Sequence, residues 1–174
     1  ACSMNLALAD CRLHVCSRSQ LDLSENQLGP EGAKALAPAL VRTSLTVLIL
    51  SCNPIKDEGA IAIGHALRDN ADCKMQTLEL VYCGIGAGGA KALAAGVAAS
   101  GSLRSLDLQF NPIGNEGAKA IAEALVSSSL DTLAINGCGI GDEGAKALAE
   151  AVRSNGSLVE LRLGWNQIGD VGAK

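Results

Sequence analysis

Leucine and isoleucine recur in pairs on alternate positions along most of the chain, which is the pattern of a β-strand with one buried face. Three residues after the second member of each pair comes Asn or Cys, and Gly always follows six residues later. Because this distance never varies, the turn after each strand is expected to be structurally constrained. The pairs are Leu21/Leu23, Leu48/Leu50, Leu78/Leu80, Leu106/Leu108, Leu133/Ile135 and Leu161/Leu163.

After each of these glycines the apolar residues change to the spacing of an amphipathic helix. Two runs show it best: Ala118, Ile121, Ala122, Leu125 and Ala145, Leu148, Ala149, Val152. Charged residues three positions apart are expected as exposed ion pairs on the other helix face: Glu31/Lys34, Glu116/Lys119 and Glu143/Lys146. Strand followed by helix in constant order predicts a parallel sheet whose short units bury their apolar faces only against their neighbours.

The pattern divides the chain into six units of one repeat domain, residues 18–174. The units are 18–44, 45–74, 75–102, 103–129, 130–157 and 158–174, and the last is truncated. Residues 1–17 are expected to form an irregular N-terminal half-repeat, because Leu6, Leu8, Cys11 and Leu13 reproduce only the strand half. The chain starts at Ala1 without an initiator Met and stops inside a unit, so a longer parent chain is expected.

The unit, Leu-x-x-Leu-x-Leu-x-x-(Asn/Cys)-x-(Leu/Ile)-Gly followed by a Gly-Ala-x-Ala helix, resembles the leucine-rich repeat of the ribonuclease-inhibitor subclass over residues 18–174. The resemblance implies an α/β fold: a right-handed leucine-rich repeat solenoid that forms a short horseshoe arc. Its parallel sheet would be concave and its helices convex. It also implies that the Asn and Cys side chains stack as a ladder that satisfies backbone groups of the turns.

Composition and charge exclude several classes of function. Lys and Arg number 14 against 18 Asp and Glu, a formal net charge of -4, which is the wrong sign for binding nucleic acid. No run approaches the ~18 apolar residues that a membrane span needs. The seven cysteines are odd in number and suggest no disulfide framework, which indicates reduced thiols and a cytoplasmic location. One glycosylation sequon, at Asn155, points weakly toward a secreted parent.

Candidate cofactor and metal motifs have simpler explanations. Residues 84–89 satisfy GxGxxG and Asp107 lies where a ribose-binding acid could stand, but similar glycines recur at 139–144 as part of the repeat. Cys11, His14 and Cys16 could offer metal ligands, yet the repeat gives Cys11 a ladder position and leaves His14 in a connecting loop. His65 is expected on an exposed helix face. We therefore expect no cofactor, no metal and no catalytic residues.

The residue before each Asn or Cys is the eighth of its unit, and we call these six residues column eight. They are Glu25, Cys52, Tyr82, Phe110, Gly137 and Trp165, which include all three aromatic residues of the chain. Exposed aromatic residues on a rigid sheet can supply most of the energy of an interface, so the column is interpreted as a binding stripe. The alternative is that the rings pack against the ladder turns.

Other positions expected on the concave face are mainly acidic. Counting column eight, they carry Asp22, Glu25, Glu79, Asp107, Asp131 and Glu160 against Arg104 and Arg162. This balance favours a partner with a basic, partly apolar patch. The alternative is a solvated acidic face that contacts nothing. The candidate partner-binding residues are Tyr82, Phe110, Trp165, Glu79, Asp107 and Arg162.

The sequence thus predicts a non-enzymatic module that recognises a partner protein on its concave face. An alternative follows from a second resemblance, to the leucine-rich activators of small GTPases, in which Arg104 or Arg162 would supply charge to the transition state. A third possibility is a structural spacer without a saturable partner.

Overall fold

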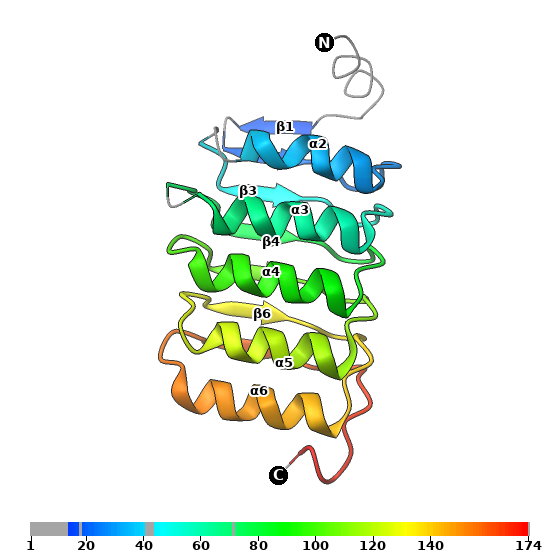
Figure 1. Cartoon of the computed structure of the whole chain (residues 1–174), viewed down its shortest axis with the longest axis vertical. Coiled ribbons are helices and arrows are strands. Elements are labelled where there is room, and N and C mark those ends of the chain that lie inside the picture. The colour runs from blue at the N-terminus through cyan, green and yellow to red at the C-terminus, as the bar shows by residue number, and fades with distance from the viewer. Residues whose placement is uncertain (1–13, 18, 41–43, 71, 174) are drawn as a thin grey trace.

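The computed structural model describes residues 14–17, 19–40, 44–70 and 72–173, in which one sheet of seven strands is covered on one side by a layer of five helices (Figure 1). Each helix follows its strand, and each helix after the first packs beside the helix of the repeat before it. The elements in chain order are β1 His14–Ser17, β2 Gln20–Asp22, α2 Pro30–Leu40, β3 Val47–Ile49, α3 Lys56–Arg68, β4 Thr77–Glu79, α4 Ala87–Ala99, β5 Ser105–Asp107, α5 Gly114–Leu125, β6 Thr132–Ala134, α6 Asp142–Ser154 and β7 Glu160–Arg162.

The strands β2 to β7 are parallel and lie in chain order, which confirms the α/β leucine-rich repeat solenoid. Their register is set by the leucines, because Leu48 pairs with Leu78 and Leu78 with Leu106. Equivalent residues of successive repeats therefore lie side by side across the sheet, and each position of the unit forms a continuous row.

The first strand departs from this pattern. β1 is antiparallel to β2, with His14 opposite Asp22 and Ser17 opposite Gln20. Only two residues separate the strands, and a parallel pair would need a crossover of a dozen or more. The expectation that His14 lies in a connecting loop is therefore wrong. Leu6, Leu8, Cys11 and Leu13 fall outside the described residues.

The core lies between the sheet and the helices and contains small aliphatic side chains. Leu78 and Leu80 are at most 1% exposed, as are Leu106 and Leu108. Glycine brings α3 and α4 into close contact, since a Cβ atom on Gly96 would come 2.7 Å from the carbonyl oxygen of Gly64. The helices thus pack tightly enough to bury leucine without aromatic residues.

Two details of the helix face differ from the sequence pattern. Ala149, expected on the inner face with Leu148, is exposed, because no further helix covers α6 in the described part of the chain. Lys119 binds Glu116 at 3.0 Å and also Glu143 of the next repeat at 2.9 Å. Glu143 therefore pairs between repeats rather than with Lys146, while Glu31 and Lys34 pair as expected.

Candidate functional site

Column eight is a regular row on the backbone as well as in the sequence. Each of its residues has a positive φ: Glu25 54°, Cys52 59°, Tyr82 54°, Phe110 56°, Gly137 63° and Trp165 61°. Backbone amides tie the row together, since Cys52 N–H donates to Val81 O at 2.7 Å and Tyr82 N–H to Gln109 O at 3.1 Å. Because the left-handed conformation recurs in every repeat, it belongs to the turn and holds one side chain per repeat at a fixed place.

Two of the aromatic residues in column eight form a stack. The rings of Tyr82 and Phe110 are 4.7 Å apart between centroids and 8° from parallel. Tyr82 is 59% exposed and Trp165 is 87% exposed, as the binding-stripe interpretation requires. Phe110 is half-buried, so the expectation that all three rings are exposed is wrong for this residue. The reason is that its ring lies between Tyr82 and the bare backbone of Gly137.

The fifth position of the unit forms a second row on the face of the sheet that the helices leave open. In register order this row is Asp22, Ile49, Glu79, Asp107, Ala134 and Arg162. Glu79 is half-buried, and burial raises the pKa of its carboxyl above the ordinary value, with further raising by the negative charges of Asp107 and Asp22. The row therefore brings Glu79, Asp107 and Arg162 onto one face and makes Glu79 a carboxylate that lacks compensation.

The acids of this row differ in their partners. Asp107 accepts hydrogen bonds from the Gln109 backbone at 3.0 Å and from the Gln109 side-chain amide at 2.8 Å. Asn136 in turn donates to Gln109 Oε1 at 2.6 Å, which extends the network into the next repeat. No hydrogen bond to the Glu79 side chain is found within the described residues. Asp107 is consequently fixed in position, whereas Glu79 can accept an external cation.

The two arginines that the sequence predicts for the concave face are held within the molecule. Arg162 Nε donates to Glu160 at 2.8 Å, and this hydrogen bond lowers the pKa of the Glu160 carboxyl. Arg104 Nη1 donates to the backbone carbonyls of Ser129 at 3.0 Å and Gly101 at 3.3 Å. Each guanidinium therefore already donates hydrogen bonds to groups of this chain.

The Asn and Cys residues form the expected ladder beneath column eight. Asn111 Nδ2 donates to the carbonyls of Leu80 at 2.7 Å and Leu108 at 2.9 Å, while its Oδ1 accepts the amides of Cys83 and Ile85, both at 3.0 Å. Cys138 takes an equivalent place and donates its thiol to Leu108 O at 3.3 Å. Burial raises the pKa of the Cys83 and Cys138 thiols to about 11, so both remain protonated at neutral pH. Each ladder residue joins two neighbouring turns.

A second ladder, which the sequence reasoning missed, explains the GxGxxG motif. The side chain of Asp57 accepts the Gly86 amide at 2.6 Å, and Asn115 accepts the Gly141 amide at 2.8 Å. A Cβ atom on Gly89 would come 2.8 Å from Asp57 Oδ1 and 2.9 Å from the Cβ of Ala60. Because glycine has no side chain, the turn can therefore pack closely against the preceding repeat. The signal in the sequence is an Asp or Asn four residues after the ladder residue, as at Asp57, Asn115, Asp142 and Asp170.

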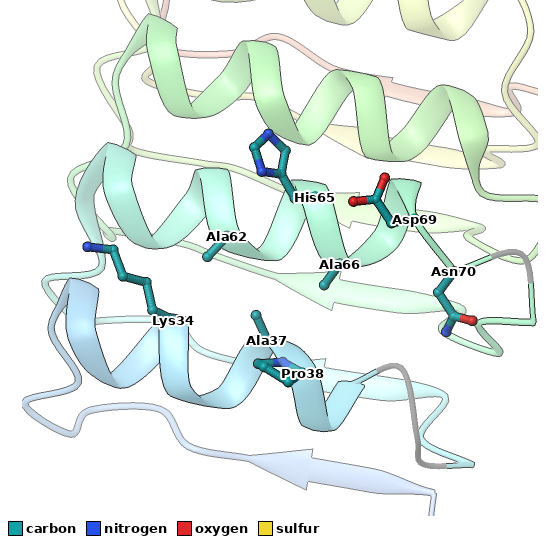
Figure 2. A pocket seen from close by; sticks show the side chains of 8 residues that line it. All are labelled: Lys34, Ala37, Pro38, Ala62, His65, Ala66, Asp69 and Asn70. Atoms are coloured by element: carbon teal, nitrogen blue, oxygen red, sulfur yellow. The ribbon is translucent and has the colours of Figure 1, made fainter.

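A shallow groove of about 490 Å³ lies on the helix side, between α2 and α3 (Figure 2). It is lined by Ala37, Pro38, Ala62 and Ala66, with Lys34, His65, Asp69 and Asn70 around them. Two of its charged residues are already paired, Lys34 with Glu31 and Asp69 with Arg68, both at 2.7 Å. His65 is exposed, as expected. The groove thus has an apolar floor and locally neutralised edges.

Within the described residues, no group of three or more His, Cys, Asp or Glu side chains is arranged to hold a metal ion. Cys11 lies outside these residues. In the same part of the chain, none of the helices combines the length and the apolar character that crossing a membrane requires.

Comparison with known proteins agrees with the fold. A family model described as "Leucine Rich repeat" matches residues 19–37, 42–64, 71–94, 100–122, 126–149 and 154–174. The chain belongs to the leucine-rich repeat family.

The curated relatives include two kinds of protein. The ribonuclease inhibitor of Sus scrofa is 35% identical over 97% of this chain and 38% of its own length. The human NACHT, LRR and PYD domains-containing protein 5 is also 35% identical, over 97% of this chain and 14% of its own length. The ribonuclease inhibitor of Mus musculus is 33% identical over 91% of this chain and 35% of that protein. The chain therefore spans less than two fifths of the length of each of these relatives, and its repeats are of the ribonuclease-inhibitor-like subclass.

Proposed function

We propose that the chain recognises a partner protein on its concave face, the sheet surface opposite the helices. The observation that carries this proposal is the Tyr82–Phe110 stack, which holds a 59% exposed ring in a fixed orientation. Ordering a flexible side chain costs part of the energy of binding, and a ring that is already stacked avoids most of that cost. The contact residues would be Tyr82, Phe110, Trp165, Glu79, Asp107 and Arg162.

Charge supports a partner with a basic, partly apolar patch. The positions predicted for the concave face carry six acids and two arginines, and both arginines already bind groups of this chain. A basic partner would be attracted at long range and would also compensate Glu79. The long-range part of this attraction weakens as salt is added.

We propose that the module acts by binding and not by catalysis. Activation of a small GTPase would need an arginine free to reach the nucleotide, whereas Arg104 and Arg162 are hydrogen-bonded to their own repeats or the adjacent one. Resemblance to proteins named as inhibitors also favours binding. Single-turnover GTP hydrolysis with a panel of small GTPases tests this point, and acceleration of any of them would overturn it.

A cytoplasmic location is part of the proposal. Cys83 and Cys138 donate hydrogen bonds as thiols from inside the ladder, and Cys52 is an exposed free thiol. Such a chain suits a reducing compartment. Fractionation of cells that produce the parent protein, with the thiols trapped by alkylation before lysis, tests the location and the redox state together.

The concave surface is tested by capture from cell extract with matched variants. Trp165→Ala removes the most exposed ring of column eight, and Val126→Ala removes an exposed apolar group at the end of α5 as a control. Some proteins should be captured by both the unsubstituted chain and Val126→Ala. We expect these proteins not to be captured by Trp165→Ala or by Phe110→Ala. A set of bound proteins that is unchanged by both aromatic substitutions would overturn the proposal.

A further inference from the structure

Column eight contains a gap directly beside the Tyr82 ring. Going along the column toward the N-terminus, the stack of Phe110 and Tyr82 is followed by Cys52, whose side chain is short and exposed, and then by Glu25. The rings are spaced by 4.7 Å, about the distance between neighbouring strands. One face of Tyr82 is covered by Phe110, so its other face is turned toward the Cys52 repeat.

The direction in which the rings lean leaves this gap open. Phe110 lies over Gly137, in the direction of the C-terminal repeats, because a Cβ atom there would be only 2.6 Å from the ring. Tyr82 is parallel to Phe110 and displaced by one repeat, so it leans the same way. The space above Cys52 is therefore bounded on one side by an exposed aromatic face and on the other by the repeat that carries Glu25.

We propose that this space is a slot for one planar cation, the guanidinium group of an arginine on the partner protein. This inference rests on the proposed function and names the side chain that the concave face recognises. A guanidinium stacked on Tyr82 would continue the ladder of rings by one position. Its N–H groups, which lie in the plane of the guanidinium, would then point outward from the stack toward the acidic row, and the carboxylate of Glu25, the next residue of column eight, would compensate its positive charge from the other face.

Two observations favour arginine over other occupants. Glu25 is exposed and enters no ion pair within the described residues, and Glu79 on the same face lacks a hydrogen-bond partner. A neutral ring in the slot would leave both carboxylates without compensation. A lysine ammonium is compact and strongly hydrated, so it would satisfy the charge but not stack as a plane on the ring.

The slot can be closed without altering the backbone. Tyr82 and Cys52 have nearly the same φ, 54° and 59°, so a tyrosine at position 52 fits the turn as it does one repeat later. Cys52→Tyr would place its own ring on Tyr82 and occupy the space. Cys52→Ser keeps the slot open and is the matched control.

The experiment is a titration of ¹⁵N-labelled protein with three capped tripeptides, Ac-Ala-X-Ala-NH₂, in which X is arginine, lysine or citrulline. Citrulline has the shape of arginine without its charge. We expect saturable shifts at the amides of Cys52 and Tyr82 with the arginine peptide, and about two- to fivefold weaker binding with either of the others. Glu25→Gln should weaken binding of the arginine peptide by about two- to fivefold.

Cys52→Ser should bind the arginine peptide as the parent chain does, whereas Cys52→Tyr should show no saturable shift. Equal binding of the three peptides, or unchanged binding by Cys52→Tyr, would overturn the arginine slot. Capture of proteins from cell extract distinguishes failure of the arginine slot from failure of the proposed function. If partners are lost with Trp165→Ala but kept by Cys52→Tyr, the concave face binds protein without the slot.

Discussion

The ring of Phe110 rests on the backbone of Gly137, where a Cβ atom would come 2.6 Å from Cδ1 and 2.9 Å from Cε1. Gly137 is the single glycine in column eight, and it directly follows Phe110 in that column. Its φ of 63° does not by itself require glycine, because Tyr82, Phe110 and Trp165 adopt the same conformation. The glycine is needed for the space that the Phe110 ring fills.

Gly137→Ala is therefore expected to destabilise the fold through a clash with Phe110. Overpacking and the left-handed backbone together should cost about 2 kcal/mol or more. In the background of Phe110→Ala, the same substitution should cost roughly 1 kcal/mol less, because only the backbone effect remains. Urea unfolding of the four proteins of this double-mutant cycle measures the difference. Equal costs in the two backgrounds would show that the ring does not depend on Gly137.

Phe110→Ala separates the structural role of the ring from its role in binding. Removal of a freely exposed ring would lower the free energy of unfolding by at most about 0.5 kcal/mol. Because the Phe110 ring is half-buried and stacked, its removal is expected to lower it by about 1 to 2 kcal/mol. If Phe110 is also a contact residue, partner affinity should fall by on the order of 2 kcal/mol. Trp165→Ala is the control for stability and should stay within about 0.5 kcal/mol. A loss of ~3 to 5 kcal/mol would identify Phe110 as a core residue instead.

The fold could be predicted from the sequence because the pattern for each strand, turn and helix recurs in successive repeats. The pairing of Leu48 with Leu78, and of Leu78 with Leu106, follows from the alternation of leucines in successive repeats, and the constant distance to Gly locates each turn. The hairpin of His14–Ser17 was missed, since its single strand has no repeated copy with which to compare it.

The candidate site was only partly predictable. Alignment of the repeats located column eight. It did not predict that Phe110 is half-buried while Trp165 is exposed. That difference depends on whether the next repeat offers a side chain or the bare backbone of Gly137, which is a contact across repeats. The unequal states of Asp107 and Glu79 have a local cause instead. The side-chain amide of Gln109 donates to Asp107 within one repeat, whereas the equivalent residue of the Glu79 repeat is Val81.

Glu79→Gln should make the protein more stable at neutral pH. The folded state raises the pKa of Glu79 above the ordinary value of about 4.5, so it binds the proton more tightly than the unfolded chain. Stability is therefore lost as pH rises from about 4.5 through the raised pKa, and the loss is complete above it. The Gln variant lacks this loss, so its advantage at pH 7 should shrink on acidification and vanish below about pH 4.5. Thermal unfolding at a series of pH values measures it.

Glu160→Gln is the matched control for this pH dependence because the shift has the opposite sign. The hydrogen bond from Arg162 lowers the pKa of Glu160, so its contribution to stability is present at neutral pH and is lost as pH falls through the lowered pKa. Glu160→Gln should thus be slightly less stable at pH 7 and equal to the parent in strong acid. A Glu79→Gln variant that follows this second pattern would refute the assignment of Glu79 as an uncompensated carboxylate.

The ladder thiols should resist alkylation while Cys52 reacts. Burial raises the pKa of Cys83 and Cys138 to about 11, and the reactive species is the thiolate. Iodoacetamide treatment of the folded protein at pH 8, followed by peptide mapping, should show modification at Cys52 and protection at both ladder positions. Unfolding in urea should remove the protection. Rapid labelling of Cys138 in the folded state would mean that the turns open locally.

Replacement of Asn111 tests how much the ladder contributes to stability. Its side chain makes four short hydrogen bonds to the backbone at 2.7 to 3.0 Å and is fully buried. Asn111→Ala leaves the amides of Cys83 and Ile85 and the carbonyl of Leu80 without a partner, and each unsatisfied group costs about 1 to 3 kcal/mol. Loss of ~3 kcal/mol or more is therefore expected, which could unfold the chain at room temperature.

Asn111→Cys is the milder substitution that keeps this prediction measurable. Cys83 and Cys138 hold the same position in neighbouring repeats and donate to a carbonyl of the preceding repeat, Leu50 or Leu108, each at 3.3 Å. A thiol at position 111 should restore the donor to Leu80 but not the acceptor for the two amides, so its cost should lie between those of Asn and Ala. Chemical unfolding and hydrogen exchange at the Cys83 and Ile85 amides would report both effects. Equal stability of the Ala and Cys variants would show that the amide acceptor, and not the donor, accounts for the stabilising role of the ladder.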